Sequence, residues 1–162
     1  MAPDVGAAKR ARNFAEVLNA PLAIIEKRRV GNGGTSQALN VIGEVEHRNA
    51  IIFDDEVDTA GTLMEAVCAL EARGVRGISC CVTHAVLSGS AVELIADSSI
   101  SEVVVTNSVY LPPKRRLDKI TVLSVASLLG DVIDSIHHGR SVGAAMAQYK
   151  SPDAGSTPNP QS

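Results

Sequence analysis

Short apolar runs alternate along the chain with longer stretches in which apolar residues recur every three or four positions. Five runs rich in Val and Ile predict β-strands, and they lie at residues 21–25, 50–53, 77–82, 102–105 and 120–124. Runs that are apolar without interruption are typical of strands covered on both faces, as in parallel sheets.

Four stretches have helical spacing instead, and they lie at residues 7–19, 59–73, 88–96 and 126–138. In the second stretch, Leu63, Val67 and Leu70 fall on one helix face, and Gly74 is a typical residue to end the helix. The alternation of strands and helices predicts a Rossmann-like α/β fold, with a mostly parallel sheet of about four or five strands flanked by helices. A two-layer or α+β arrangement is the structural alternative.

Two segments break this alternation. Residues 30–39 contain three glycines among polar residues, which predicts a flexible loop. Residues 151–162 contain three prolines and no bulky apolar residue, which is typical of a disordered tail. We therefore expect one domain over residues 1–146 and a tail over residues 147–162.

The composition fits a folded domain and disfavours some partners. Hydrophobic residues make up 45% of the 162 residues, which is enough to bury a sizeable core. Aromatic residues make up only 2%, so stacking platforms for single-stranded nucleic acid are not expected. The 15 Lys and Arg residues against 18 Asp and Glu give a net charge of −3, which argues against a general binder of nucleic acid or other polyanions.

The cysteines and the apolar runs indicate a compartment. Cys68, Cys80 and Cys81 have neither metal-ligand nor redox spacing, and the last two lie side by side in an apolar run, which favours buried thiols in a reducing compartment. No apolar run reaches the roughly 18 to 20 residues that span a bilayer, and the first residues lack the pattern of a signal peptide. We expect a cytoplasmic protein without a membrane partner.

The strongest chemical signal follows the apolar run at residues 50–53, which continues into acidic residues, a turn of small residues and a helical stretch. Asp54 and Asp55 would lie at the carboxyl end of the strand, where carboxylates can accept hydrogen bonds from sugar hydroxyls or hold Mg²⁺. The turn at residues 59–62 would direct backbone N–H groups and two hydroxyls to a helix N-terminus that suits a phosphate. The alternative is that Asp58 caps the helix beside a solvated acidic turn.

His84 follows the predicted strand at residues 77–82 and would lie on the same ligand-bearing edge. We favour a hydrogen-bonded structural histidine over a chemical role for it. No set of Cys and His residues has zinc spacing.

Several stretches together resemble the ribose-phosphate pyrophosphokinase family, which has the type I phosphoribosyltransferase fold. The acidic block DDEVDTAGT at residues 54–62 is similar to the ribose-5-phosphate loop of that fold. Further matching segments follow the order of the family, at residues 3–6, 9–11, 25–29, 40–43, 83–89, 104–107 and 123–126. The acidic block alone would indicate only the broader fold, whereas the whole set is specific to the synthetases.

The resemblance implies a role for each matching position. The residues that would hold the 5-phosphate of ribose are Asp58, Thr59, Ala60, Gly61 and Thr62. The residues that would form the pyrophosphate loop are Asp4, Val5, Gly6 and Ala7. Asp54 and Asp55 would contact the ribose hydroxyls and the metal shell, and Asp4 would help to hold Mg²⁺. Lys27 and Arg29 match the basic residues of the catalytic flexible loop.

The implied reaction transfers a pyrophosphoryl group from ATP to the C1 hydroxyl of ribose 5-phosphate and releases AMP. The transfer builds negative charge on phosphate oxygens. The point charge of Lys27 and the planar guanidinium of Arg29 are both suited to stabilise this charge. A glycine-rich loop at residues 30–39 can close over such a site and exclude water. The alternative for the two basic residues is a solvated strand end. The alternative for Asp4 is a helix cap beside surface residues.

The family also has an amino-terminal half, to which nothing here corresponds. We expect the chain to be the carboxy-terminal portion of a synthetase, present as a homo-oligomer or associated with full-length synthetase subunits. Ala7 stands where the family usually has glycine, so the approach of pyrophosphate to that backbone would be hindered.

Three functional hypotheses follow. The first is the ribose-phosphate diphosphokinase itself, with Mg²⁺ as cofactor and ATP as co-substrate, in nucleotide precursor synthesis. The second is a non-catalytic subunit that binds full-length synthetases. The third is a phosphoribosyltransferase proper, which shares the acidic loop but leaves the basic residues at 27–29 unexplained.

Overall fold

The computed structural model describes residues 1–30 and 36–149, and for residues 27–30 and 36–38 it describes the backbone alone. The chain divides into two compact units, Met1–Leu123 and Ser124–Ser162. The predicted tail at residues 151–162 lies outside the described residues. The domain boundary expected after residue 146 stays a prediction.

A parallel sheet is the centre of the first unit. Its four strands lie side by side in chain order, as β3 (Asn49–Val57), β4 (Gly77–Ala85), β5 (Ile100–Thr106) and β6 (Ile120–Leu123). The predicted strands at residues 50–53, 77–82, 102–105 and 120–124 are thus found, most of them one to several residues longer than the apolar run. This confirms an α/β fold with a mostly parallel sheet.

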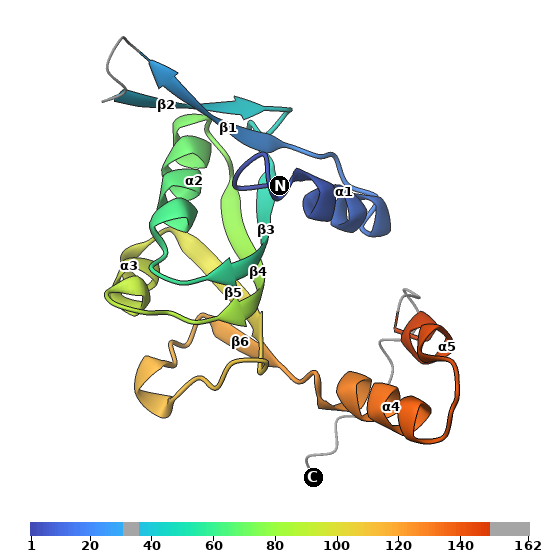
Figure 1. Ribbon diagram of the computed structural model, residues 1–162. Helices are drawn as coiled ribbons and strands as arrows, with labels where there is room; N and C mark the ends of the chain where they lie inside the picture. The colour runs from blue at the N-terminus through green and yellow to red at the C-terminus, as the bar shows by residue number, and fades with distance from the viewer. Residues whose placement is uncertain (31–35, 150–162) are drawn as a thin grey trace. The chain divides into compact units, whose positions relative to one another are not determined.

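Three helices cover the two faces of this sheet, and they are α1 (Ala8–Val17), α2 (Gly61–Ala72) and α3 (Ala91–Asp97). Helix α2 connects β3 to β4, and α3 connects β4 to β5. Crossovers between parallel strands are right-handed, and these two run in the same direction across the sheet, so both helices lie on the same face. Figure 1 shows α2 and α3 on one side of the sheet and α1 on the other.

Neighbouring residues of one strand face the two different helix layers. Ile52 is fully buried in the core that α2 and α3 cover, whereas Phe53 packs with α1 and stacks on Phe14, with ring centroids 4.1 Å apart. Cys80 and Cys81 are divided in the same way, so the first is fully buried and the second is half-buried. Successive side chains of a strand point to opposite faces of the sheet, which explains this division.

An antiparallel hairpin corrects two predictions. β1 (Ile24–Val30) pairs with β2 (Ser36–Ile42), so the predicted strand at 21–25 begins later and part of the predicted loop at 30–39 is strand. The paired residues Ile25 and Val41 are both buried, and this packing outweighs the low strand propensity of the polar residues nearby. Residues 31–35 lie outside the described part of the chain.

The first two residues join the sheet to the hairpin. The amino group of Met1 donates to Ile51 O at 2.6 Å, and Phe53 N donates to Met1 O at 2.9 Å. On its other side Ala2 forms a parallel bridge with Ile24. Residues 1–2 therefore act as a short strand beside β3, followed at once by the loop that leads into α1.

The second unit contains α4 (Ala126–His137) and α5 (Val142–Ala147). The first confirms the predicted helix at residues 126–138, and the second was not predicted. Ser141 caps α5 by accepting a hydrogen bond from Ala144 N at 3.3 Å. The apolar side chains of Leu129, Ile133 and Ile136 lie on one face of α4 and are 54%, 67% and 64% exposed.

Candidate functional site

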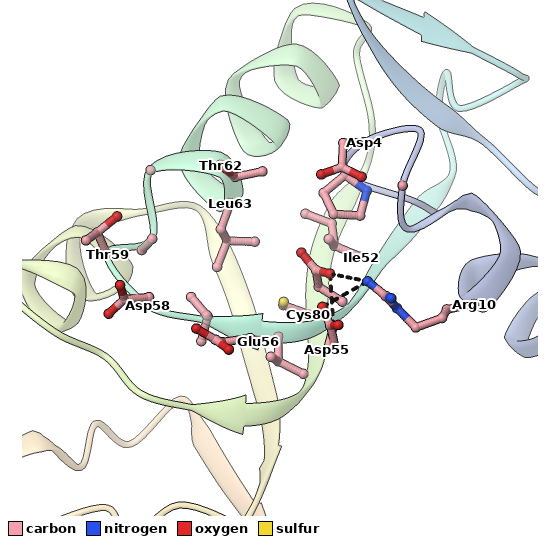
Figure 2. A pocket seen from close by; sticks show the side chains of 17 residues that line it. Asp4, Arg10, Ile52, Asp55, Glu56, Asp58, Thr59, Thr62, Leu63 and Cys80 are labelled. Carbon is pink, nitrogen blue, oxygen red and sulfur yellow. Dashed lines mark hydrogen bonds and ion pairs between the residues drawn. The ribbon is translucent and has the colours of Figure 1, made fainter.

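The candidate site is a hollow of about 420 Å³ between the start of the chain and the connection from β3 to α2. It lies at the carboxyl ends of β3 and of the short strand at residues 1–2, whose following helices α2 and α1 lie on opposite faces of the sheet. This is a topological switch point, which is where open α/β sheets bind ligands. Figure 2 shows Asp4 and Arg10 on one side of the hollow, and Asp58 and Thr59 on the other.

The acidic pair lies in the strand itself. Asp54 and Asp55 belong to β3, which continues to Val57, so they precede the strand end rather than follow it as expected. Side-chain exposure is 22% for Asp54 and 54% for Asp55, and Asp55 N donates to Asp54 Oδ1 at 2.9 Å. Both side chains line the hollow, as the sequence predicted.

Arg10 from α1 contacts this pair. Its Nη2 atom lies 2.9 Å from Asp55 Oδ1 and 3.3 Å from Asp54 Oδ1. Burial is the main cause that raises the pKa of Asp54, and the hydrogen bond between the two carboxyl groups is the main cause that lowers the pKa of Asp55. Among the described residues that line the hollow, Arg10 is the one cation beside five acidic side chains.

Sequence analysis gave Arg10 no role in the site, although it lies in the matching segment at residues 9–11, and so missed it. The signal was present, because Arg10 follows the matching loop at residues 4–7 within the first turn of α1. A helix that starts at the rim of the hollow directs its first turn toward that rim. The contact with the acidic pair itself depends on the packing of α1 beside β3, which the sequence pattern does not specify.

The predicted phosphate loop forms the other wall. Asp58, Thr59, Ala60, Gly61 and Thr62 all line the hollow. Helix α2 begins at Gly61, after Ala60, which is buried and adopts the left-handed conformation with φ of 64°. No side chain caps this N-terminus, so its first N–H groups keep their capacity to bind an anion.

Asp58 is not the cap of α2, so the capping part of the alternative interpretation is wrong. Its carboxylate accepts a hydrogen bond from the hydroxyl of Ser88 instead. Two further donors act on the same segment, since Val86 N and Leu87 N each donate to Val57 O at 3.0 Å. The predicted helix at residues 88–96 starts only at Ala91 because residues 86–88 make these contacts.

The predicted pyrophosphate loop is split by the fold. Asp4 and Gly6 line the hollow, whereas Val5 is 64% exposed and Ala7 is buried away from it. Ala7 N donates to Asp4 Oδ1 at 2.9 Å, so Asp4 does order the start of the first helix, and its side chain still faces the hollow. A side chain at Gly6 would place its Cβ 3.2 Å from Asp4 Oδ1, so glycine gives the carboxylate room.

Lys27 and Arg29 lie in β1, where the backbone is described and the side chains are outside the described part. Their catalytic role therefore stays a prediction. His84 is confirmed as a hydrogen-bonded histidine, with Nδ1 at 2.9 Å from the hydroxyl of Ser108.

Comparison with known proteins agrees with this geometry. The family model described as "Phosphoribosyl synthetase-associated domain" matches residues 33–147. The chain belongs to the phosphoribosyl synthetase-associated domain family. The matched segment contains the acidic pair and the whole phosphate loop at residues 58–62.

Relatives of this phosphoribosyl synthetase-associated domain are longer than the chain itself. A ribose-phosphate pyrophosphokinase of Caldanaerobacter subterraneus subsp. tengcongensis is 49% identical over 142 residues, which are 88% of this chain and 45% of that protein. One of Corynebacterium ammoniagenes is 45% identical over 142 residues, which are 88% of this chain and 44% of that protein. The chain thus spans about half the length of the curated relatives it matches.

A solved structure supports the fold. The phosphoribosylpyrophosphate synthetase from Mycobacterium smegmatis superposes with a TM-score of 0.79 and 34% identity, over 85% of this chain and 44% of that one. Over residues 1–30 and 36–149, the chain has no helix with the length and apolar character needed to cross a bilayer.

Proposed function

We propose that this chain binds ribose 5-phosphate and acts in the ribose-phosphate diphosphokinase reaction, in which ATP and ribose 5-phosphate give AMP and 5-phosphoribosyl 1-pyrophosphate. The observation that carries the proposal is one hollow lined both by the Asp54–Asp55 pair and by the uncapped start of α2. A sugar phosphate suits both walls, because its hydroxyls donate to carboxylates and its phosphate accepts from helix N–H groups.

The two walls would orient the sugar. With the 5-phosphate at residues 58–62, the hydroxyls would face the acidic pair and the C1 hydroxyl would point toward Asp4 and Gly6. The phosphate would add charge to a hollow that already has five acidic side chains and one arginine. This balance requires a cation, or the protonation of a carboxyl group, when the ligand enters.

Mg²⁺ fits this donor set as a cofactor that arrives with phosphate ligands. Within the described ranges, no three His, Cys, Asp or Glu side chains gather closely enough to hold a metal ion. Mg²⁺ is typically bound by one or two carboxylates, with substrate phosphates and water completing its shell. We propose Asp4 as the residue that would hold it, with Asp54 and Asp55 in its outer shell. Bound there, Mg²⁺ would neutralise charge on phosphate oxygens.

ATP is the proposed co-substrate, and its β-phosphorus is the atom that the sugar attacks. The C1 hydroxyl oxygen of ribose 5-phosphate forms a bond to the β-phosphorus of ATP and loses its proton. The bond between the β-phosphorus and the oxygen that bridges to the α-phosphorus breaks, and AMP leaves. We propose that Lys27 and Arg29 stabilise the charge that develops on the nonbridging oxygens. Both residues lie on β1, the strand that precedes residues 31–35.

The same proposal covers location and assembly. We propose a cytoplasmic protein, since Cys68, Cys80 and Cys81 are free thiols, as is usual in a reducing compartment. We also propose a homo-oligomer or a complex with full-length synthetase subunits.

Isothermal titration calorimetry with ribose 5-phosphate and Mg²⁺ tests the proposal on the full chain. We expect a single site, and the Asp58→Ala variant should bind at least about tenfold more weakly, about 1.4 kcal/mol, because the phosphate loop loses its anchor. Asp97→Ala, an exposed carboxylate at the end of α3, is the matched control and should bind normally. A folded chain that gives no binding heat would refute the proposal.

One observation favours a second candidate function, that of a subunit which associates with full-length synthetases. The exposed apolar side chains of Leu129, Ile133 and Ile136 give α4 a face that suits a protein partner. Co-purification with a full-length ribose-phosphate pyrophosphokinase tests this candidate. Ile133→Glu should abolish the association, and Lys27→Ala should leave the activity of the mixture unchanged if the chain is a non-catalytic subunit. Lost activity with Lys27→Ala would favour the enzyme.

A further inference from the structure

The connection between β4 and α3 holds the start of the phosphate loop. Residues Val86 and Leu87 donate their N–H groups to Val57 O at 3.0 Å each, and Ser88 N donates to Asp58 O at 3.0 Å. The hydroxyl of Ser88 adds a hydrogen bond to the Asp58 carboxylate. Four donors from residues 86–88 thus act on two consecutive residues, immediately before the turn that begins α2.

Each of the two segments that meet in this contact contains a residue with a left-handed backbone conformation. Ala60, two residues after Asp58, has φ of 64°, and Leu87, just before Ser88, has φ of 51°. Left-handed conformations are unfavourable for residues with a Cβ and persist only where the surroundings hold them. Here the restraint comes from burial of the Leu87 side chain, which is 1% exposed, and from the hydrogen bonds to residues 57–58.

Residues 86–88 are themselves anchored from a third element. Arg115 of the 3₁₀ helix Pro113–Arg115 donates from Nη1 to Leu87 O at 3.2 Å and to Val86 O at 3.4 Å. The segment at residues 86–88 therefore lies between the Arg115 guanidinium and the phosphate loop. Hydrogen bonds on both sides leave Ser88 little freedom, so its hydroxyl can fix the orientation of Asp58.

We propose that Ser88 is a positioning residue for substrate binding, whose hydroxyl holds the Asp58 carboxylate so that the N–H groups at residues 59–62 stay available to a phosphate. This inference rests on the proposed function. The physical reason is that a free carboxylate beside the helix start can turn toward those N–H groups, compete for them and repel the anion. Held by a hydroxyl donor, its charge is partly compensated and its direction is set.

The test combines calorimetry with a double-mutant cycle. For Ser88→Ala we expect about tenfold weaker binding of ribose 5-phosphate, about 1.4 kcal/mol, with Ser88→Thr binding within about threefold of the original chain. In the Asp58→Asn background, Ser88→Ala should change the affinity by less than about twofold, because the group through which it acts is already altered. The matched control is Ser90→Ala, whose hydroxyl caps nothing at the start of α3 and should not matter.

Several results would overturn the proposal. Binding by Ser88→Ala as tight as that of the original chain would show that Ser88 does not support binding. An equal loss of affinity in the Asp58→Asn background would show that Ser88 does not act through Asp58. Circular dichroism establishes folding first, and if Ser88→Ala does not fold, Ser88→Cys, with its weaker donor, takes its place with the same expectation.

Hydrogen exchange separates this inference from the proposed function. If the original chain does not bind ribose 5-phosphate, the proposed function fails, but the positioning of the loop can still be measured. Ser88→Ala should then speed the exchange of the amides at residues 59–63 at least about fivefold, while Ser90→Ala leaves them unchanged. Unchanged exchange in Ser88→Ala would overturn the positioning role as well.

Discussion

The Arg10 guanidinium, on the α1 side of the hollow, lies 2.9 Å from the Asp55 carboxylate of β3. The same guanidinium reaches Asp54 at 3.3 Å, so one positive charge from the α1 side balances two negative charges in the strand. This ion pair joins α1 to β3 at one wall of the proposed binding site.

The first prediction concerns the strength of that link. Arg10→Ala should lower the free energy of unfolding by about 0.5 to 1 kcal/mol, a small loss because the arginine side chain is 47% exposed. Urea denaturation measures this, and the loss should shrink at high salt. Arg12→Ala, an exposed arginine on the same helix, is the control and should have less effect. Equal losses for the two variants would contradict the role of the ion pair.

The second prediction follows from the raised pKa of Asp54. Because burial raises this pKa above its ordinary value of 3.8, the folded state holds its proton to higher pH than the unfolded state does. As the pH rises through that interval, the unfolded state ionises first and the native protein loses stability. The loss is complete above the folded-state pKa and stays constant toward neutral pH.

Asp54→Asn removes this penalty. We expect its melting temperature at pH 7 to exceed that of the original chain, because the neutral amide has no charge to desolvate. The gap should close as the pH falls to about 3.8. Thermal unfolding followed by circular dichroism at a series of pH values measures it. A gap that is constant over the whole series would show that Asp54 is not desolvated in the folded state.

The third prediction concerns the backbone at Ala60. A β-branched residue is strongly disfavoured at its φ of 64°, whereas glycine adopts such a value freely. Ala60→Val should therefore weaken the binding of ribose 5-phosphate more than about tenfold, about 1.4 kcal/mol, and Ala60→Gly should keep it within about threefold. Calorimetry on the two variants makes the comparison. Similar affinities for both would mean that the turn does not need the left-handed conformation.

The fourth prediction concerns Lys119, which lies just before β6 and contacts the end of α3. Lys119 donates from Nζ to the carbonyl groups of Ile95, Ala96 and Ser98, each at 3.1 Å, at the carboxyl end of α3. A cation there donates to carbonyls at the end of the helix, where the intrahelical hydrogen bonds stop, and it complements the helix dipole. Lys119→Met should cost about 1 to 2 kcal/mol of unfolding free energy in urea denaturation. Lys114→Met, at an exposed lysine, should cost much less.

Sequence reasoning predicted the parallel sheet well because the strands are buried runs that need no partner to be recognised. The run that contains Ile52 and the helix face that contains Leu63 carry their own periodicity, and both were found in place. The β2 strand was missed because its polar residues pair only in the context of β1. Short α5 was missed because six residues give too little periodicity.

The site shows the same difference between features contained in one segment and features that depend on a distant segment. The acidic pair and the phosphate loop were predicted because they are contiguous in the chain. The partners of these residues were not predicted, since Arg10 and Ser88 reach them from 45 and 30 positions away. Contacts of that range depend on how α1 and the connection after β4 pack, and one sequence contains no direct record of this.

The central claim, that a sugar phosphate binds where β3 passes into α2, is tested most directly by a nuclear magnetic resonance titration of the ¹⁵N-labelled chain with ribose 5-phosphate and Mg²⁺. We predict that the largest shifts of backbone amide signals fall at residues 59–62, with smaller shifts at Asp54 and Asp55. Shifts centred elsewhere, such as on the unit from Ser124 onward, or no shifts from a folded chain, would contradict the claim.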